Sequence, residues 1–455
     1  MNTDFGSLHK VIAIFFSLLI LVNGYFLAKR AGTWFTPSGI ISIFWFGYTF
    51  FPLALVYSAP INAMSAIYIC VAIFLFTLSS YFIPWRGAFL ANQKKEALNL
   101  KMEFHTNFLL KTFYTSQALV ILSLILEIRS NGFSLANIIF NLLETSSAYI
   151  ELRYADEANH SFLTRVGTVF TYVGVMLGGL VFCAARSAPK KILILMISLF
   201  PAVVIMVVQG AKGTLFLCAM FFYSTLLIYR LYAGKISLTD RRTNKNLLLT
   251  AAVLFPAIVS SFLARGLHGH DTDYIIEKLL SYMSSYALAH MYAFSDWLSF
   301  YTSEPHLMHY EQAEDYYYGF YTFMSVFKAL GSTIEVPMGT YDEYFNYNDF
   351  LKTNVYTLFR GLILDFGIIG SLLFMFILGT ITTFSFYVLL RSTKAYFSIS
   401  FFAIMFGFYY TCFISVFIWN STFLTFFMFA LILMLNRQIL ILRSKQRRNK
   451  LGITK

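Results

Sequence analysis

The feature that most constrains this chain is a series of about eleven apolar blocks, each long enough to cross a bilayer as an α-helix. A hydropathy window of about 19 residues places the blocks near residues 11–28, 39–58, 63–84, 108–128, 163–184, 192–209, 214–232, 247–263, 366–390, 395–416 and 423–440. Hydrophobic residues make up 58% of the chain and charged residues 12%, whereas soluble domains contain about 45–50% and 25%. The sequence therefore predicts an all-α, polytopic integral membrane protein.

Basic residues occur in every second short loop between these blocks. The basic positions are Lys29 and Arg30, Arg86 to Lys101, Arg186 to Lys191, Lys235 to Lys245, Arg391 and Lys394, and the tail from Arg437. With an odd number of spans all of these loops face one side, and the positive-inside rule makes that side cytoplasmic. The net charge of +12 is then a topology signal, and no nucleic-acid partner is predicted because no nucleic-acid-binding motif accompanies it.

This charge pattern predicts an external amino terminus and a cytoplasmic carboxy terminus. Alkaline phosphatase fused after Lys455 is expected to be inactive, because that enzyme matures only outside the cytoplasm, whereas a fluorescent protein at the same position should fluoresce. Phosphatase activity from the Lys455 fusion would overturn this topology.

The chain is expected to divide into four parts. They are a bundle of about eight spans (1–263) with a smaller periplasmic segment (129–160), a periplasmic helical insert (264–354), C-terminal spans (355–440) and a basic cytoplasmic tail (441–455). The run from Ser134 to Tyr154 is amphipathic enough to lie on the membrane surface as a helix. The large insert is rich in Tyr, His and Asp and is too apolar and aromatic for a disordered linker. We therefore expect the chemistry to lie there.

Charged residues at the predicted outer membrane edge are the first functional candidates, since charge near hydrocarbon is costly unless it faces protein, water or a ligand. Lys212 lies in a tight QGAKG turn between the sixth and seventh spans, and Arg265 follows the eighth span. Arg360 and Asp365 precede the ninth span. Two interpretations are open: each cation extends to headgroup phosphates, or the cations converge on a pocket for a diphosphate.

The stretch from Asp365 to Gly370 has structural interpretations as well. Its Asp-Phe-Gly is not accompanied by the other kinase motifs, so a kinase is excluded. Asp365 fits the N-cap of the ninth span, and Gly367 with Gly370 fits a small-residue face for helix contact.

Two further groups in the insert are open to interpretation. The HGHDTD stretch, residues 268–273, suits a divalent metal by composition but not by order, so a solvated turn is favoured and no metal site is predicted. His268 or His270 suits a general base instead, since imidazole titrates near working pH. Tyr317 and Tyr341 belong to an aromatic run that fits either an interfacial belt or platforms for sugar rings.

The four cysteines give no sign of a disulfide framework or a cofactor. Cys70, Cys183, Cys218 and Cys412 all lie inside apolar blocks, without CxxC or His-Cys spacing. A free cysteine behaves as a small apolar residue, so we expect these four to pack in the helix bundle. No cofactor is predicted.

The segment TNVYTLFRGLILDFGIIGSLLFMFILG, residues 353–379, resembles the signature of bacterial oligosaccharide repeat-unit polymerases, the Wzy-type O-antigen and capsule polymerases. The match lies in Asn-x-Tyr-Thr, followed by Asp-Phe-Gly and a further Gly. QGAKGTLFL resembles a second family feature, a glycine-rich turn that normally carries Arg. Here Lys212 stands in that place and would hold phosphate as a point charge rather than as a bidentate fork.

The resemblance implies a GT-C-like membrane glycosyltransferase that joins undecaprenyl-diphosphate-linked repeat units at the periplasmic face of the bacterial inner membrane. The partners it implies are those lipid-linked oligosaccharides and the bilayer, with a polysaccharide chain-length regulator as a further candidate. The roles expected are diphosphate binding by Lys212, Arg265 and Arg360, catalysis by His268, His270 and Asp365, and substrate binding by Asn354, Tyr356, Tyr317 and Tyr341.

Other functions remain open beside this one. A flippase for lipid-linked oligosaccharides also needs cations for a diphosphate, but it has no evident need for a large structured insert, and the chain lacks the repeated halves common in transporters. An O-antigen ligase is disfavoured only by the resemblance of residues 353–379. A purely structural membrane protein leaves the external cations unexplained.

Overall fold

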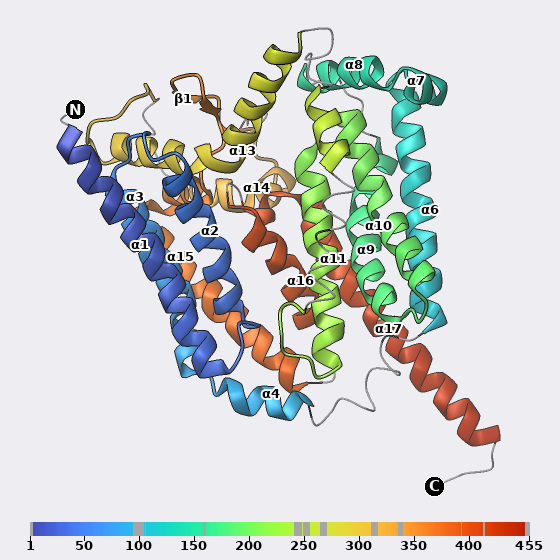
Figure 1. Cartoon of the computed structure of the whole chain (residues 1–455). Coiled ribbons are helices and arrows are strands. Elements are labelled where there is room, and N and C mark those ends of the chain that lie inside the picture. The colour runs from blue at the N-terminus through green and yellow to red at the C-terminus, as the bar shows by residue number, and fades with distance from the viewer. Residues whose placement is uncertain are drawn as a thin grey trace. The chain divides into compact units, whose positions relative to one another are not determined.

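The computed structural model describes residues 3–93, 104, 106–155, 157, 161–240, 248, 255–263, 271–310, 317–334, 340–392, 394–412 and 415–450. Almost all regular structure in these residues is helical (Figure 1). The α-helices are α1 (Thr3–Ala31), α2 (Pro37–Leu55), α3 (Ala63–Leu78), α4 (Trp85–Gln93), α6 (Asn107–Ser130), α7 (Leu135–Phe140), α8 (Leu142–Tyr154), α9 (Phe162–Ala184), α10 (Ala188–Gln209), α11 (Lys212–Tyr232), α13 (Thr272–Tyr301), α14 (Phe320–Ala329), α15 (Leu358–Arg391), α16 (Tyr396–Tyr410) and α17 (Asn420–Lys450). The structure also contains two short 3₁₀ helices, η1 (Ser79–Phe82) and η2 (Val416–Ile418). The predicted all-α class is confirmed.

Nine helices in the described part of the chain are long and apolar enough to cross a membrane. They are α1, α2, α3 continued by η1, α6, α9, α10, α11, α15 and α17, and each overlaps a predicted block. Of the predicted span 247–263, the structure describes residues 248 and 255–263, and these are helical. The predicted span 395–416 is occupied by α16, which has 15 residues and is shorter than the other spans. The protein is therefore a multi-pass membrane protein, whereas the count of eleven and the GT-C-like arrangement stay predictions.

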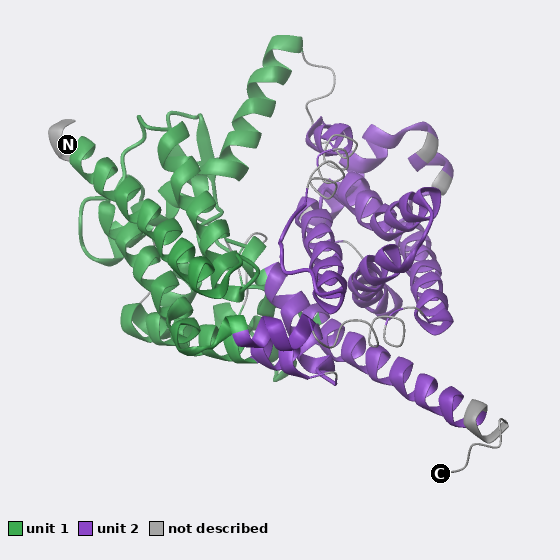
Figure 2. Ribbon diagram, turned by 60° about the horizontal axis from the view of Figure 1, so that its bottom comes forward, with its two compact units in different colours: residues 1–86, 267–384, 408–420 green, residues 87–266, 385–407, 421–455 purple. Residues whose placement is uncertain are grey.

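The chain forms two compact units, each assembled from separate stretches of sequence (Figure 2). Unit 1 consists of residues 1–86, 267–384 and 408–420, and unit 2 of residues 87–266, 385–407 and 421–455. These boundaries differ from the four parts expected from sequence. Most of the large insert belongs to the same unit as the first three spans.

Within unit 1, the long helix α13 is built into the core. Its carboxy-terminal half, from Ala289 to Ser299, is buried throughout, and it packs against α2, α3 and β2. The Tyr292 hydroxyl hydrogen bonds to the Pro52 and Val56 carbonyl oxygens, at 3.0 and 2.5 Å. Pro52 lies in the last turn of α2 and Val56 is its C-cap residue, so both carbonyls lie at the carboxy-terminal end of this helix. The contact therefore ties the insert to a membrane-spanning helix.

The insert also contains a small β-hairpin, which the helical prediction missed. Strands β1 (Phe345–Tyr347) and β2 (Leu351–Thr353) pair antiparallel, with Phe345 opposite Thr353. Asn348 and Asp349 turn the chain with positive φ angles of 51° and 52°, a conformation that short polar side chains tolerate best. Phe345 and Leu351 are buried, so the hairpin presents one apolar side to the unit 1 core.

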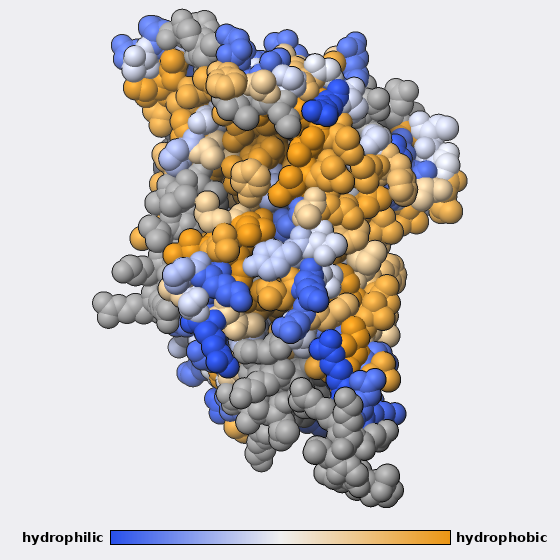
Figure 3. Space-filling model, turned by 90° about the vertical axis from the view of Figure 1, so that its right-hand side faces the viewer, coloured by the Kyte–Doolittle hydropathy of each residue, from blue (hydrophilic) through white to orange (hydrophobic). Residues whose placement is uncertain are grey.

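Unit 2 contains α6, α9, α10 and α11 as neighbouring long helices. The run from Ser134 to Tyr154 forms α7 and α8, which confirms that it is helical, whereas its place outside the membrane stays a prediction. Apolar side chains gather in a broad band between polar and charged side chains on the face drawn in Figure 3. Exposed apolar residues on α6 and α10 include Leu122, Leu126, Ile192, Leu193 and Met196. Such surface suits lipid rather than water.

The sequence predicts that Gly367 and Gly370 form a face for contact with another helix, but the structure gives both glycines other roles. Gly367 breaks the helix, with φ 69° and ψ 177°. A Cβ at Gly370 would meet only Phe366 of the same helix within 4 Å, among the described residues. Gly379 makes the close helix contact instead, because a Cβ there would collide with the Phe76 carbonyl oxygen and lie 2.6 Å from its Cα.

Replacing Gly379 by alanine is therefore expected to destabilise the protein by about 1–3 kcal/mol, the range for overpacking a well-packed core. Gly47→Ala, in α2, is the matched control: its Cβ would meet the Phe51 ring at 3.8 Å, an ordinary contact, and helix propensity favours the change. Thermal unfolding in detergent measures both variants. An unchanged midpoint for Gly379→Ala would contradict the packing of α15 against α3.

Candidate functional site

The polar residues at the start of the 353–379 segment bind the insert in unit 1. The Asn354 side-chain amide donates to the Tyr341 carbonyl oxygen, at 3.2 Å. The Tyr356 hydroxyl donates to the Glu343 carbonyl oxygen, also at 3.2 Å. Tyr356 is fully buried. These two bonds hold the stretch around residues 341–343 against the segment that leads into α15.

Arg360 lies at the centre of this cluster and is 4% exposed. Its Nη2 lies 3.0 Å from both carboxylate oxygens of Glu343. Four aromatic rings surround the guanidinium carbon, with centroids 4.0–5.8 Å away: Tyr341, Tyr356, Trp297 and Tyr310. A cation over a desolvated ring gains about 2 kcal/mol. The arrangement is an aromatic cage closed by one carboxylate, and we call it the Arg360 cage.

The Arg360 cage retains unused hydrogen-bond donors. Nε and Nη1 of Arg360 are buried and have no hydrogen-bond partner in the described part of the chain. Burial raises the pKa of the Tyr341 hydroxyl well above its usual range, and it raises the pKa of Tyr356 to about 12 against the opposing charge of Arg360. These phenols therefore stay neutral at physiological pH, so they can donate hydrogen bonds. Because the Tyr356 hydroxyl already donates to Glu343, the donors that the cage can offer to an anion such as a phosphate oxygen are the Nε–H and Nη1–H groups of Arg360.

Asp365 has a defined structural role in the same unit. Its carboxylate is 1% exposed and accepts hydrogen bonds from the Tyr321 backbone N–H at 3.0 Å, the Thr322 N–H at 2.7 Å and the Thr322 hydroxyl at 2.6 Å. These donors lie in the first turn of α14, whose own N-cap residue, Gly319, has no side chain to offer. Asp365 thus caps α14 rather than its own span, because its carboxylate oxygens accept these hydrogen bonds from the first turn of α14.

Tyr317 and Tyr341, the two tyrosines predicted to bind substrate, are linked through Tyr321. The Tyr317 ring lies edge-on to Tyr321 at 5.0 Å, and Tyr321 stacks on Tyr341 at 5.7 Å. Tyr341 in turn covers Arg360. The structure therefore brings Tyr317, Tyr341, Tyr356 and Arg360 into one aromatic cluster.

Lys212 occupies a separate position in unit 2. Its Nζ donates to the Ser261 carbonyl oxygen at 3.3 Å and lies 4.0 Å from the Phe262 ring centroid. Gly210, with φ 66°, ends α10, and Lys212 begins α11. A buried lysine at the positive end of a helix dipole makes an electrostatic environment that favours an anion.

The remaining predicted residues cannot be placed together with these. Arg265, His268 and His270 lie outside the described residues, and Lys212 and Arg360 belong to different units. The joint diphosphate pocket therefore stays a prediction. Of the HGHDTD stretch, Asp271 is the N-cap residue of α13 and Asp273 lies in its first turn. The described residues include no group of three or more His, Cys, Asp or Glu that could hold a metal ion.

The sequence did not single out Glu343, Trp297 or Tyr310, although all three contact Arg360. Glu343 is one of several acidic residues between 342 and 349, and its spacing to Arg360 matches no motif. Trp297 and Tyr310 are two of many aromatic residues in the insert, and no motif distinguishes them from the others. Comparison of the chain with protein-family models, with curated proteins and with solved structures returns no match.

Proposed function

We propose that this protein is an oligosaccharide repeat-unit polymerase, a membrane glycosyltransferase that acts on undecaprenyl-diphosphate-linked units at the periplasmic face of the inner membrane. The observation that carries the proposal is the Arg360 cage. The 353–379 segment, which resembles the polymerase signature, contributes a buried arginine with two uncommitted donor nitrogens. The aromatic insert encloses that arginine within a multi-pass membrane protein.

The reaction joins two lipid-linked chains. A hydroxyl at the non-reducing end of the incoming unit attacks the anomeric carbon of the growing polymer, and a new C–O bond forms there. The bond between that carbon and the diphosphate oxygen breaks, so the lipid diphosphate leaves with the electron pair. The proton of the attacking hydroxyl passes to a base, for which His268 and His270 are the candidates.

The charged residues act on the leaving group in this scheme. Negative charge develops on the departing diphosphate, and preorganised cations stabilise it most in a site that excludes water. Arg360 supplies N–H donors from within its cage, and Lys212 and Arg265 are the further cations proposed. Asp365 acts indirectly, because it fixes the first turn of α14 beside the aromatic cluster. Tyr317 and Tyr341 offer ring faces to sugars.

The proposal is tested in a strain whose gene for this protein is deleted. The expected result is lipopolysaccharide or capsule that carries a single repeat unit, with banding restored by the wild-type gene. Absence of any repeat unit on the core would indicate a ligase, and accumulation of lipid-linked units on the cytoplasmic side would indicate a flippase. Lipid-linked units extracted from the deletion strain then serve as substrate for purified protein in proteoliposomes, where a ladder on a gel is expected.

A further inference from the structure

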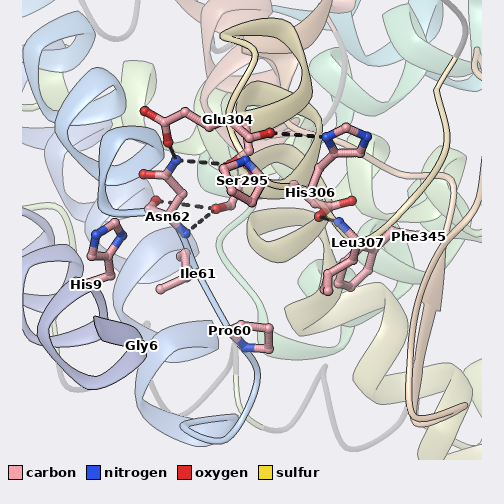
Figure 4. A pocket seen from close by; sticks show the side chains of 13 residues that line it. Gly6, His9, Pro60, Ile61, Asn62, Ser295, Glu304, His306, Leu307 and Phe345 are labelled. Carbon is pink, nitrogen blue, oxygen red and sulfur yellow. Dashed lines mark hydrogen bonds between the residues drawn. The ribbon is translucent and has the colours of Figure 1, made fainter. Parts of the chain in front are cut away.

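Unit 1 contains a cavity of about 350 Å³ that is distinct from the Arg360 cage (Figure 4). Five stretches line it: the first turns of α1 around His9, Pro60–Asn62 before α3, residues 295–299 of α13, Glu304–Leu307 after α13, and Phe345 of β1. Small-molecule pockets in proteins occupy about 300–1,000 Å³. The cavity is therefore large enough for a small ligand.

Asn62 organises the polar side of this cavity. Its side-chain amide donates to the Ser299 hydroxyl at 3.0 Å and to the Glu304 carboxylate, while its backbone N–H donates to Ser295 Oγ at 2.9 Å. In Figure 4, Asn62 lies below the Glu304 carboxylate, with His9 on one side and Ser295 on the other. The network fixes Glu304 through one carboxylate oxygen, and the other oxygen can accept a hydrogen bond from a ligand hydroxyl.

His9 supplies the complementary donor. Its Nδ1 accepts the backbone N–H of Ala63 at 3.3 Å, and a nitrogen that accepts carries no proton. The neutral ring must then carry its proton on Nε2, which is a donor. Ile61, Leu307 and Phe345 add apolar surface to the same cavity. The combination of an acceptor, a donor and apolar walls matches the hydroxyl edge and the C–H face of a sugar ring.

The charge of the cavity lining argues against a phosphate ligand. None of the described residues that line it is Lys or Arg, whereas Asp296 and Glu304 are both acidic. Both carboxylate oxygens of Asp296 are already used within the cavity wall, because they accept the Leu307 and Met308 backbone N–H groups, at 2.5 and 3.1 Å. Burial raises the pKa of Asp296, and these hydrogen bonds oppose the rise. A phosphate would meet the Glu304 carboxylate without a compensating cation.

The cavity adjoins the Arg360 cage through one residue. The Tyr310 hydroxyl donates to Asp296 at 2.8 Å, and the Tyr310 ring lies 5.8 Å from the Arg360 guanidinium carbon. A ligand in the cavity is therefore separated from Arg360 by the Asp296–Tyr310 pair. The cavity and the cage therefore lie on opposite sides of one buried hydrogen-bonded pair.

We propose that this cavity is a subsite for a neutral sugar of the incoming repeat unit, with Glu304 and His9 as its hydrogen-bonding side chains. The assignment to the incoming unit rests on the proposed polymerase function. Sugar binding itself can be measured without polymerisation. The two ideas are therefore separable by experiment.

The binding experiment uses the full chain in lipid nanodiscs and saturation-transfer NMR with glucose, galactose, N-acetylglucosamine and glucose 6-phosphate. At least one neutral sugar is expected to bind, and Glu304→Gln and His9→Ala should each weaken that binding about tenfold, the effect of losing one strong hydrogen bond. Glu277→Gln, which changes an exposed acid of α13, is the matched control. Equal thermal midpoints of all variants establish that the fold is kept.

Three results would overturn the subsite. They are no signal for any neutral sugar, equal binding in wild type and both cavity variants, and tighter binding of glucose 6-phosphate than of glucose. In the polymerisation assay, the cavity variants should raise the KM for the incoming unit and leave kcat unchanged, because they remove ground-state binding. Variant-sensitive sugar binding without any polymerisation would reject the polymerase and retain the subsite. Polymerisation with unaltered KM would reject the subsite alone.

Discussion

Alanine in place of Arg360 is expected to lower the rate of repeat-unit polymerisation about 10²–10³-fold, the range for loss of one preorganised charge-stabilising group. At about 4 Å and an effective dielectric near 20, one contact between a cation and phosphate is worth roughly 4 kcal/mol. Arg360 is 4% exposed, so solvent screens such a contact little. The measurement is the initial rate in proteoliposomes at equal protein abundance.

The variant Arg360→Ala also leaves the Glu343 carboxylate without its partner, and a loss of about 2 kcal/mol in stability is expected. Glu343→Gln separates the two effects, because it keeps the arginine. If Arg360 acts on the diphosphate, Glu343→Gln should retain activity within about tenfold of wild type, and Arg360→Lys should recover part of the rate as a point charge. Equal losses in both single variants, with no further loss in the double variant, would mean that Arg360 serves only to bind Glu343.

Alanine in place of Asp365 is expected to unfold part of unit 1. It removes an acceptor that binds three donors of α14, and hydrogen bonds to a charged group contribute about 1.5–3 kcal/mol each. Allowing for relaxation of the helix end, we expect a loss of about 3 kcal/mol in stability. Polymerisation should fall as well, because α14 carries Tyr321, which stacks on Tyr341. Thermal unfolding in detergent and limited proteolysis between residues 317 and 334 measure the effect.

Thr322→Val is the matched control for Asp365. It removes only the hydroxyl donor and keeps both backbone N–H bonds, so its cost should be about 1 kcal/mol. Asp365→Asn retains one carbonyl acceptor, so its loss in stability should lie between those of Thr322→Val and Asp365→Ala. A midpoint for Asp365→Ala equal to that of wild type would show that α14 holds its position without the cap. Normal stability with lost activity would instead favour a direct catalytic role for Asp365.

The membrane-spanning helices were predictable because hydropathy acts locally along the chain. Each of the nine candidate spans in the described residues overlaps a predicted block. The burial of α13 was not predictable in this way, because it depends on partners far away in sequence. Tyr292 reaches Pro52 and Val56, and His290 Nε2 lies 2.9 Å from the Tyr48 carbonyl oxygen. The hairpin had a local signal, since Asn348 and Asp349 separate short runs of aromatic and apolar residues, but the insert as a whole was predicted to be helical and no strand was assigned.

Part of the candidate site was predictable for a different reason. Asn354, Tyr356, Arg360 and Asp365 lie within 12 residues of sequence, so the motif that located Asn354, Tyr356 and Asp365 also encloses Arg360, which its charge at the predicted membrane edge had singled out. Their partners come from distant stretches: Trp297 from α13, and Tyr341 and Glu343 from the region before the hairpin. No spacing rule connects these stretches. The capping role of Asp365 likewise required knowing that Gly319 begins a helix.

The discontinuous makeup of unit 1 has a consequence for how the protein is made. Its first stretch ends at residue 86, its second begins at 267, and its last ends at 420. During synthesis, therefore, α1, α2 and α3 enter the membrane and wait while the ribosome produces 180 intervening residues of unit 2 (87–266) before their partners appear. Nascent chains should be most vulnerable to quality-control proteases in this interval. Reporter fusions placed before residue 420 lack part of unit 1, so topology mapping should use insertions into the full-length chain.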